Sequence, residues 1–247
     1  MVKFVVFCTK IIAATIAAVL FSSCHFKGIH FGDGIDGNGN VTKETRKVEN
    51  NFSKIDVSRG LTVSLEQAET YSVEVDADEN LQKHITTRVE NGTLLITTDE
   101  NIDEAKSKNI RVKLPLLTNL EVTSGSSVSS NSIFTGTDID VKTSSGSETI
   151  LKLEIDNIFC EASSGSTLSI KGKALQLKSS ASSGSSIIAK DLLVNNVIAQ
   201  SSSGSSIVVH PIVSLNAKSS SGSSIDYNGS PKTVVKEETS GGSVSKE

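Results

Sequence analysis

The chain contains few large or chemically reactive side chains. Its 247 residues include no Trp, one Met, eight Phe and two Tyr. A hydrophobic core must therefore be built from aliphatic residues. Lectin-like surfaces contact sugars through broad Trp and Tyr faces, and the aromatic residues beyond position 41 are too few for extended stacking: Phe52, Tyr71, Phe134, Phe159 and Tyr227. Polar recognition through rows of serine is the other route to sugar binding.

Long apolar runs are also scarce, and the one at the N-terminus indicates export. A positively charged start is followed by an apolar run at residues 11–21, which is shorter than the ~20 residues needed to span a bilayer. We therefore expect residues 1–23 to be a cleaved signal peptide. Residues 20–24 (LFSSC) resemble a bacterial lipobox, which implies that Cys24 is joined to diacylglycerol and starts the mature chain. An ordinary signal peptide is the alternative.

The expected processing leaves one thiol and a mildly acidic chain. Cys8 is lost with the signal peptide and Cys24 is acylated, so Cys160 has no partner for an intramolecular disulfide. Loss of two Lys from the 24 basic residues leaves 22 against 28 acidic residues, a net charge of −6, which does not attract nucleic acid. Acyl chains, palmitate among them, would anchor the protein in the cell envelope, at the outer membrane.

The segment after the lipobox is rich in Gly, Asp and Asn. Residues 24–41 have little hydrophobic periodicity, and we expect a flexible tether. Residues 33–40 (DGIDGNGN) also offer oxygens at a spacing that suits calcium. They lack the Glu at the twelfth position and the flanking helices of an EF-hand loop, so we predict no metal site and no cofactor.

Two different β patterns follow the tether. Residues 42–118 contain short runs of alternating apolar and polar residues, such as 61–65 (LTVSL) and 94–97 (LLIT), with polar turns between them. This pattern predicts a β-rich N-terminal part of half-buried strands. In residues 119–247 a Ser-Gly pair recurs at intervals of 18 to 21 residues, with the glycines at Gly125, Gly146, Gly165, Gly184, Gly204, Gly222 and Gly241.

Alignment on these glycines shows which positions point inward. The third residue after the glycine and the seventh before it are aliphatic in nearly every repeat, and apolar residues recur two positions further out on each side. Two strands with period two therefore meet at each Ser-Gly-Ser corner. A unit this short must stack on its neighbours, so we predict an all-β solenoid with coils of ~19 residues. The variable coil length favours a right-handed parallel β-helix.

Candidate catalytic groups are scattered. The histidines His25, His30, His84 and His210 have no metal-ligand spacing to Cys or carboxylates. Asp138 and Asp140 share a strand face but form no acid–base pair across a cleft, and the repeated serines belong to the corners. Cys160 falls in a column of small apolar residues, which predicts a buried, unreactive thiol. We therefore expect no enzyme.

The chain resembles the bacterial family described as "putative auto-transporter adhesin, head GIN domain", typical of Bacteroidetes lipoproteins. The resemblance spans residues 48–244 and rests on Cys24, on the serial Ser-Gly-Ser corners, and on segments 51–61 (NFSKIDVSRGL), 71–75 (YSVEV) and 91–96 (NGTLLI). It implies a right-handed β-helix-like fold and an envelope location. No catalytic residues carry over.

These observations predict a non-enzymatic, lipid-anchored envelope protein that acts as an adhesin, exposed at the cell surface. Its partners would be the membrane, through the N-terminal lipid, and a surface protein or glycan. A structural or signalling scaffold within the cell envelope is the first alternative, and a polysaccharide-active β-helix enzyme is the second.

Overall fold

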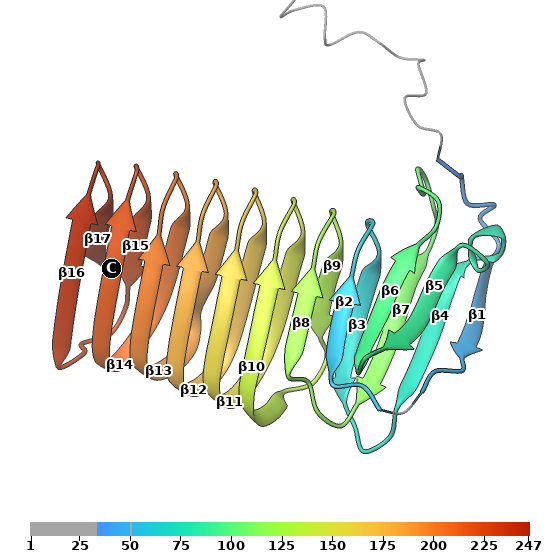
Figure 1. The fold of residues 1–247 in the computed structure, drawn as a ribbon, viewed down its shortest axis with the longest axis horizontal. Helices are drawn as coiled ribbons and strands as arrows, with labels where there is room; N and C mark the ends of the chain where they lie inside the picture. Colours follow the sequence, from blue (N-terminus) through green and yellow to red (C-terminus); the bar gives the residue numbers. More distant parts are fainter. Residues whose placement is uncertain (1–33, 50) are drawn as a thin grey trace, which may run out of the picture. The chain divides into compact units, whose positions relative to one another are not determined.

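The structure is a computed structural model that describes residues 34–49 and 51–247. These residues form one all-β unit in which the chain winds as a flattened, right-handed parallel coil (Figure 1). In Figure 1 the front strands rise to the corners at the top, the chain crosses there to the rear strands, and each coil advances toward the C-terminus. The structure confirms the fold class predicted from the repeat.

The strands fall into three groups by their place in the coil. Four long strands each follow most of one coil: β11 (Glu148–Ala162), β12 (Thr167–Ala181), β13 (Ser186–Ser201) and β14 (Ser206–Ser220). Shorter strands complete the stack: β2 (Lys54–Val57), β3 (Thr62–Gln67), β8 (Asn119–Val122), β9 (Ser127–Ser130), β10 (Phe134–Thr143), β15 (Ser224–Tyr227), β16 (Thr233–Thr239) and β17 (Ser243–Lys246). The N-terminal end contains β1 (Val41–Arg46), β4 (Ser72–Asp78), the 3₁₀ turn η2 (Glu79–Leu81), β5 (Ile85–Glu90), β6 (Thr93–Thr98) and β7 (Lys108–Leu114).

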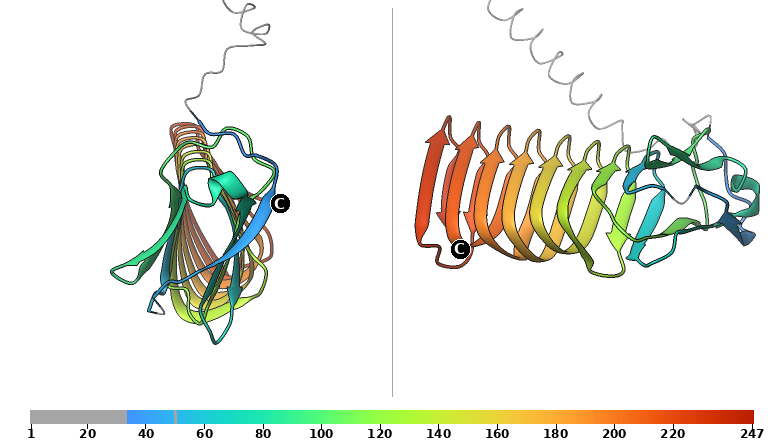
Figure 2. Two further views of the ribbon diagram at one scale, coloured as in Figure 1. Left: turned by 90° about the vertical axis from the view of Figure 1, so that its right-hand side faces the viewer. Right: turned by 60° about the horizontal axis from the view of Figure 1, so that its bottom comes forward.

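Each coil has a tight corner, a wide bend and two faces. We call the strand segments that lead into a corner the front face and those that leave it the rear face. In β12, residues 167–172 pair on the rear face and residues 176–181 on the front face. A long strand therefore passes around the bend from the rear of one coil to the front of the next. Figure 2 shows the coils end-on, narrow at the corners and wide at the bend.

The core is a set of aliphatic columns that run along the stack. Ile187 stacks between Leu168 and Ile207, and Val197 between Leu177 and Leu215, and all six side chains are at most 1% exposed. Because side chains alternate between the two sides of a strand, the parallel register puts these apolar columns on the inside of the coil.

The corners use two consecutive residues in the left-handed backbone region. In the fourth Ser-Gly corner Ser183 has φ 53° and Gly184 has φ 70°, and each of the other Ser-Gly corners has the same combination. Positive φ at both central residues defines a type I′ turn, which joins two adjacent strands tightly. Glycine adopts this conformation without steric cost, whereas the preceding serine does not.

The chain order and the spatial order differ at the N-terminal end. Strands β2 and β3 pair in parallel with β8 and β9 on one side and with β6 and β7 on the other. The corner between β2 and β3 is Arg59-Gly60, with φ 62° and 70°. The stack therefore begins before residue 119, because this earlier coil lies directly against the first Ser-Gly coil.

Antiparallel strands close the N-terminal end of the stack. On the rear face β4 pairs antiparallel with β7 and β1 pairs antiparallel with β4, while on the front face β5 pairs antiparallel with β6. Figure 1 shows these strands on the right, where the regular coil gives way to crossing segments. This arrangement leaves no parallel coil edge at that end.

Residues 34–41, the last part of the stretch expected to be a tether, are held against this closure. Ile35 forms a β-bridge with Ile102, and the Asp78 carboxylate accepts hydrogen bonds from the amides of Gly39 and Ser107 at 2.9 and 3.0 Å. Burial by itself would raise the pKa of Asp78, but these amides and that of Lys106 outweigh it and lower the pKa.

The other sequence predictions for the N-terminus concern residues that the structure does not describe. The signal peptide at 1–23 and residues 24–33 of the expected tether, which include Cys24, His25 and His30, lie outside the described residues. Within the described part of the chain, no helix has the length and apolar character needed to cross a membrane.

Candidate functional site

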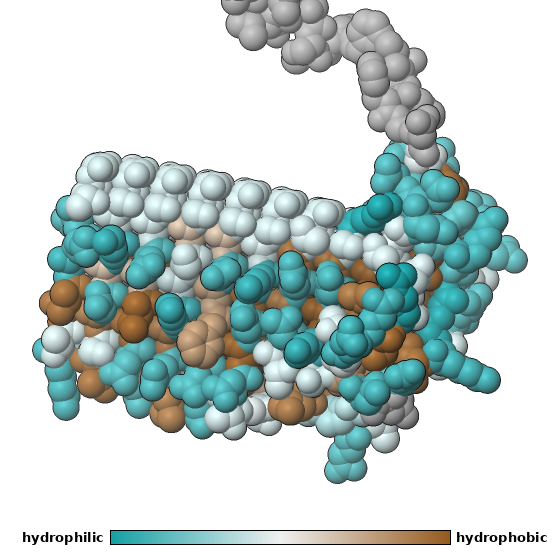
Figure 3. Space-filling model, viewed as in Figure 1, coloured by the Kyte–Doolittle hydropathy of each residue, from teal (hydrophilic) through white to brown (hydrophobic). Residues whose placement is uncertain are grey.

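The most regular surface is the row of corners. Seen in Figure 3, it forms a pale, continuous ridge along the top of the molecule. Each corner exposes one Ser and one Gly, and the glycine amide donates to the carbonyl of the corresponding Ser in the next coil, as from Gly184 to Ser203 at 3.1 Å. The six glycine amides that are paired in this way, from Gly125 to Gly222, are therefore not available to bind an anion.

The second serine of the corners points into the molecule. Ser185 is 1% exposed, and its hydroxyl lies 2.7 Å from the carbonyl oxygen of Ala162 and 2.8 Å from that of Ser182. Ser166, Ser205 and Ser223 make equivalent contacts to the coil before them. These hydroxyls satisfy backbone carbonyls in the core, so they are structural groups and not nucleophiles.

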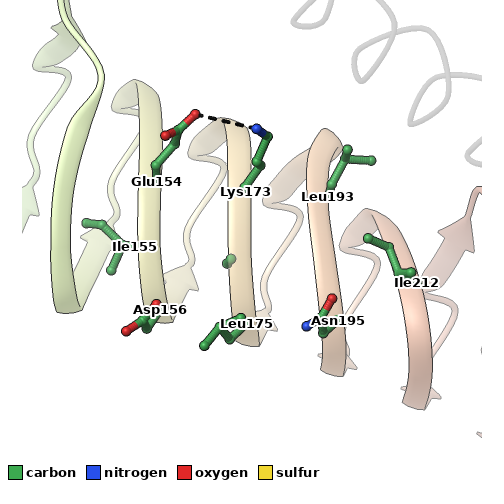
Figure 4. Close-up of a pocket in the computed structure, with 9 residues that line it drawn as sticks. Glu154, Ile155, Asp156, Lys173, Leu175, Leu193, Asn195 and Ile212 are labelled. Atoms are coloured by element: carbon green, nitrogen blue, oxygen red, sulfur yellow. Dashed lines mark ion pairs between the residues drawn. The ribbon is translucent and has the colours of Figure 1, made fainter.

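The wide bend carries a groove that differs from the corner ridge. It crosses β11, β12, β13 and β14 where each strand turns from the rear face to the front face, and its volume is about 370 Å³. Figure 4 shows its lining side chains on adjacent strands: Glu154, Ile155, Asp156, Lys173, Ala174, Leu175, Leu193, Asn195 and Ile212.

Exposed aliphatic side chains border this groove. Leu175, Leu193 and Ile212 are 50%, 41% and 45% exposed. Leu116 and Ile133, at 43% and 50%, continue the exposed apolar residues toward the N-terminal end. Apolar side chains that gather in one groove on a protein surface are typical of an interaction site, whereas single exposed residues are not.

Irregular strand register creates the groove. The pairing of β12 with β13 shifts between Ser169 and Gly172, and the pairing of β13 with β14 shifts at two places in the same region. Gly172 has φ 125°, and a Cβ on it would lie 2.0 Å from the carbonyl oxygen of Leu153. The close backbone approach therefore requires glycine.

The charges at the groove are peripheral and loosely paired. Lys173 Nζ lies 4.0 Å from Glu154 Oε1, and both side chains are largely exposed. In the described part of the chain, no three His, Cys, Asp or Glu side chains come together in a way that could hold a metal ion. The arrangement can bind an elongated ligand by apolar contact with polar borders.

The front face carries the remaining acidic and thiol candidates. Asp138 accepts a hydrogen bond from Asn157 Nδ2 at 2.9 Å in an exposed position. Cys160 is 1% exposed, and burial, with smaller effects of Asp140 and Glu161, raises the pKa of its thiol to about 12. It packs inward as a small apolar residue.

The two described histidines lie apart from each other, and neither is among the residues that line the groove. His84 Nδ1 lies 2.9 Å from Asp99 Oδ1 near the N-terminal closure. His210 Nδ1 lies 3.2 Å from the backbone carbonyl oxygen of Lys190. The structure brings neither into contact with another predicted catalytic candidate.

The groove is the feature that sequence reasoning missed. Its signal is a break in alternation: Ala174 and Leu177 point inward, and two outward residues, Leu175 and Gln176, stand between them. Such a break indicates a bulge. Which bulged residues line up across coils depends on the pairing register.

The regular parallel coil with an open surface groove places the protein in the class of repetitive β-solenoids. Residues 51–231 match the family described as "putative auto-transporter adhesin, head GIN domain". The chain belongs to this family, as its segment motifs and corners suggested. None of the curated proteins matches it significantly.

Solved structures with the same fold come from Bacteroidetes. A putative adhesin from Bacteroides fragilis has a TM-score of 0.81 at 19% identity, over 87% of this chain and all of the other. A putative lipid binding protein from Parabacteroides distasonis has a TM-score of 0.70 at 20% identity, over 86% and 99%. A putative adhesin from Parabacteroides merdae has a TM-score of 0.64 at 20% identity, over 86% and 98%. At these identities the similarity establishes the fold.

Proposed function

We propose that this protein is a non-enzymatic adhesin that holds a surface protein or glycan along the groove at the wide bend. The observation that carries the proposal is the group of exposed aliphatic side chains, Leu175, Leu193 and Ile212, that line one groove on adjacent coils. Stacked strands hold these residues at fixed spacing, so binding does not require the surface to become ordered first. The family description supports the same role.

We further propose that the protein is exported and anchored in the cell envelope, at the outer membrane, through lipid on Cys24. The signal-like residues 1–23 and the lipobox-like residues 20–24 support this anchor. Metabolic labelling with a radioactive fatty acid tests it: the wild-type chain should become labelled and Cys24→Ala should not. Equal labelling of both would refute the anchor, and protease treatment of intact cells would show whether the head is surface-exposed.

A binding screen with matched variants tests the groove. Purified residues 34–247, which form one compact unit, would be screened against host matrix proteins, glycan arrays and whole cells. For each ligand found, Leu193→Lys should weaken binding at least tenfold, because it replaces an apolar contact of the groove lining with a charge. Ile198→Lys is the control, since Ile198 is similarly exposed (45% against 41%) but does not line the groove.

Three outcomes would count against this proposal. Uniformly negative binding would argue against adhesion, and equal loss in both variants would place the contact outside the groove. Crosslinking in intact cells adds the third: capture of one fixed endogenous envelope protein, in the absence of any external ligand, would favour the scaffold alternative.

A further inference from the structure

The last coil differs from every coil before it at two inward positions. In the parallel register Lys236 follows Ala217 and Ala199, and Glu238 follows Ser219 and Ser201. The four earlier residues are at most 4% exposed. The last coil therefore carries a cation and an anion at positions where the two coils before it carry small, buried residues.

The edge of the last rear strand, β17, shows what these charges do. The amides of Ser243 and Glu247 donate to the carbonyls of Ser223 and Tyr227 in the preceding coil, at 3.0 and 3.1 Å. In a parallel pair, alternate residues direct both their N–H and C=O groups to opposite neighbours. The N–H and C=O groups of Val244 thus face the open end, where a further coil would bind.

Side chains from β16 form hydrogen bonds with both of these groups. Lys236 Nζ donates to the Val244 carbonyl oxygen at 2.8 Å, and Glu238 Oε1 accepts from the Val244 amide at 2.6 Å. A further strand would supply Val244 with the same two partners, a donor for its C=O group and an acceptor for its N–H group. Lys236 Nζ also lies 5.2 Å from the centre of the Tyr227 ring, so the lysine side chain covers the end of the core.

We propose that Lys236 and Glu238 form a side-chain cap that replaces a further coil and prevents a second copy of this chain from stacking on the C-terminal end. An approaching copy would have to displace both hydrogen bonds to Val244 and bury two charges at the new interface. Inward-pointing charges on an edge strand are a known means of preventing edge-to-edge association. At the other end of the stack, antiparallel strands pair with the edge strands of the coil instead.

The test restores the residues of the preceding coil. Lys236→Ala with Glu238→Ser gives the last coil the pair found at Ala217 and Ser219, and leaves the edge groups of Val244 free. Lys218→Ala with Glu237→Ser is the matched control, because it makes the same changes in an outward ion pair of 2.8 Å. All three proteins, as residues 34–247, would be compared by analytical ultracentrifugation over a range of concentrations.

We expect the wild-type and control proteins to remain monomeric. The variant with Lys236→Ala and Glu238→Ser, called the capless variant, should approach twice the monomer mass as its concentration rises. Two ends related by a two-fold axis would pair their edge strands, so a closed dimer is the expected product. Hydrogen exchange gives the second measurement: the Val244 amide should exchange slowly in the wild type, fast in the monomeric variant, and slowly again in its dimer.

Each contrary result refutes a stated part of the proposal. A folded capless variant that stays monomeric at all concentrations would show that the charges do not prevent stacking. Fast exchange of the Val244 amide in the wild type would show that the side-chain cap does not form. Dimerisation of the outward control to the same extent would assign the effect to the loss of any Lys–Glu pair near this end, and not to the cap on Val244.

Discussion

Replacement of Gly184 by Val should destabilise the coil through backbone strain at one corner. Gly184 has φ 70°, and a Cβ at this position would meet no atom within 4 Å. The substitution therefore introduces no clash, and it keeps the amide that donates to Ser203. A β-branched residue at positive φ costs about 2–3 kcal/mol, which for a unit of this size lowers the Tm by roughly 4–12 °C.

A matched pair of substitutions isolates the cause. Gly184→Ala should lose about 1–2 kcal/mol because of its positive φ. Gly136→Ala should be nearly neutral: Gly136 lies outside the positive-φ region, and its Cβ would meet Leu116 at an ordinary 3.5 Å. Ser183→Gly, at the neighbouring residue with φ 53°, should raise the Tm slightly. Thermal unfolding by circular dichroism measures all four; equal Tm values for Gly184→Val and wild type would refute the reasoning.

Three further predictions concern other parts of the coil. Gly172→Ala should lower the free energy of unfolding by at least about 3 kcal/mol in denaturant titrations, because its Cβ would lie 2.0 Å from the Leu153 carbonyl oxygen; wild-type stability would contradict this close approach. Ser185→Ala should cost about 1–2 kcal/mol by removing the hydroxyl that bonds to Ala162, which the same titrations test. The pKa of the Cys160 thiol is raised from 9.0 to about 12 in the folded protein, so the unfolded chain loses this proton at a lower pH. The free energy of unfolding should therefore fall as the pH rises from 9 to 12. Cys160→Ala should lack this part of the fall.

The repeat could be recognised from the sequence because its causes are local. Alternation in the segments around Gly184 shows which side chains point inward, and the Ser-Gly pair favours a tight turn. Both depend on residues within one coil. The same reasoning placed Cys160 inside the coil, where the structure finds it.

The groove could not be found in this way. Leu175, Leu193 and Ile212 occupy positions in their repeats that differ in distance from the Ser-Gly corner. Register shifts at the bend absorb the differences in coil length and decide which residues become neighbours, so that Leu193 lies beside Lys173. A sequence alignment on the corners therefore does not show which residues the pairing places side by side at the groove.

By itself, then, the sequence determined the all-β coil, its corners, its aliphatic interior and the family, because turn geometry and side-chain alternation are properties of short segments. Only the tertiary structure decided that the Arg59-Gly60 coil lies between β6–β7 and β8–β9, that exposed leucines line one groove, and that Lys236 and Glu238 cover Val244. The physical reason is that these features depend on which strands become neighbours, and backbone hydrogen bonds between distant segments make that choice without leaving a repeated pattern in the side chains.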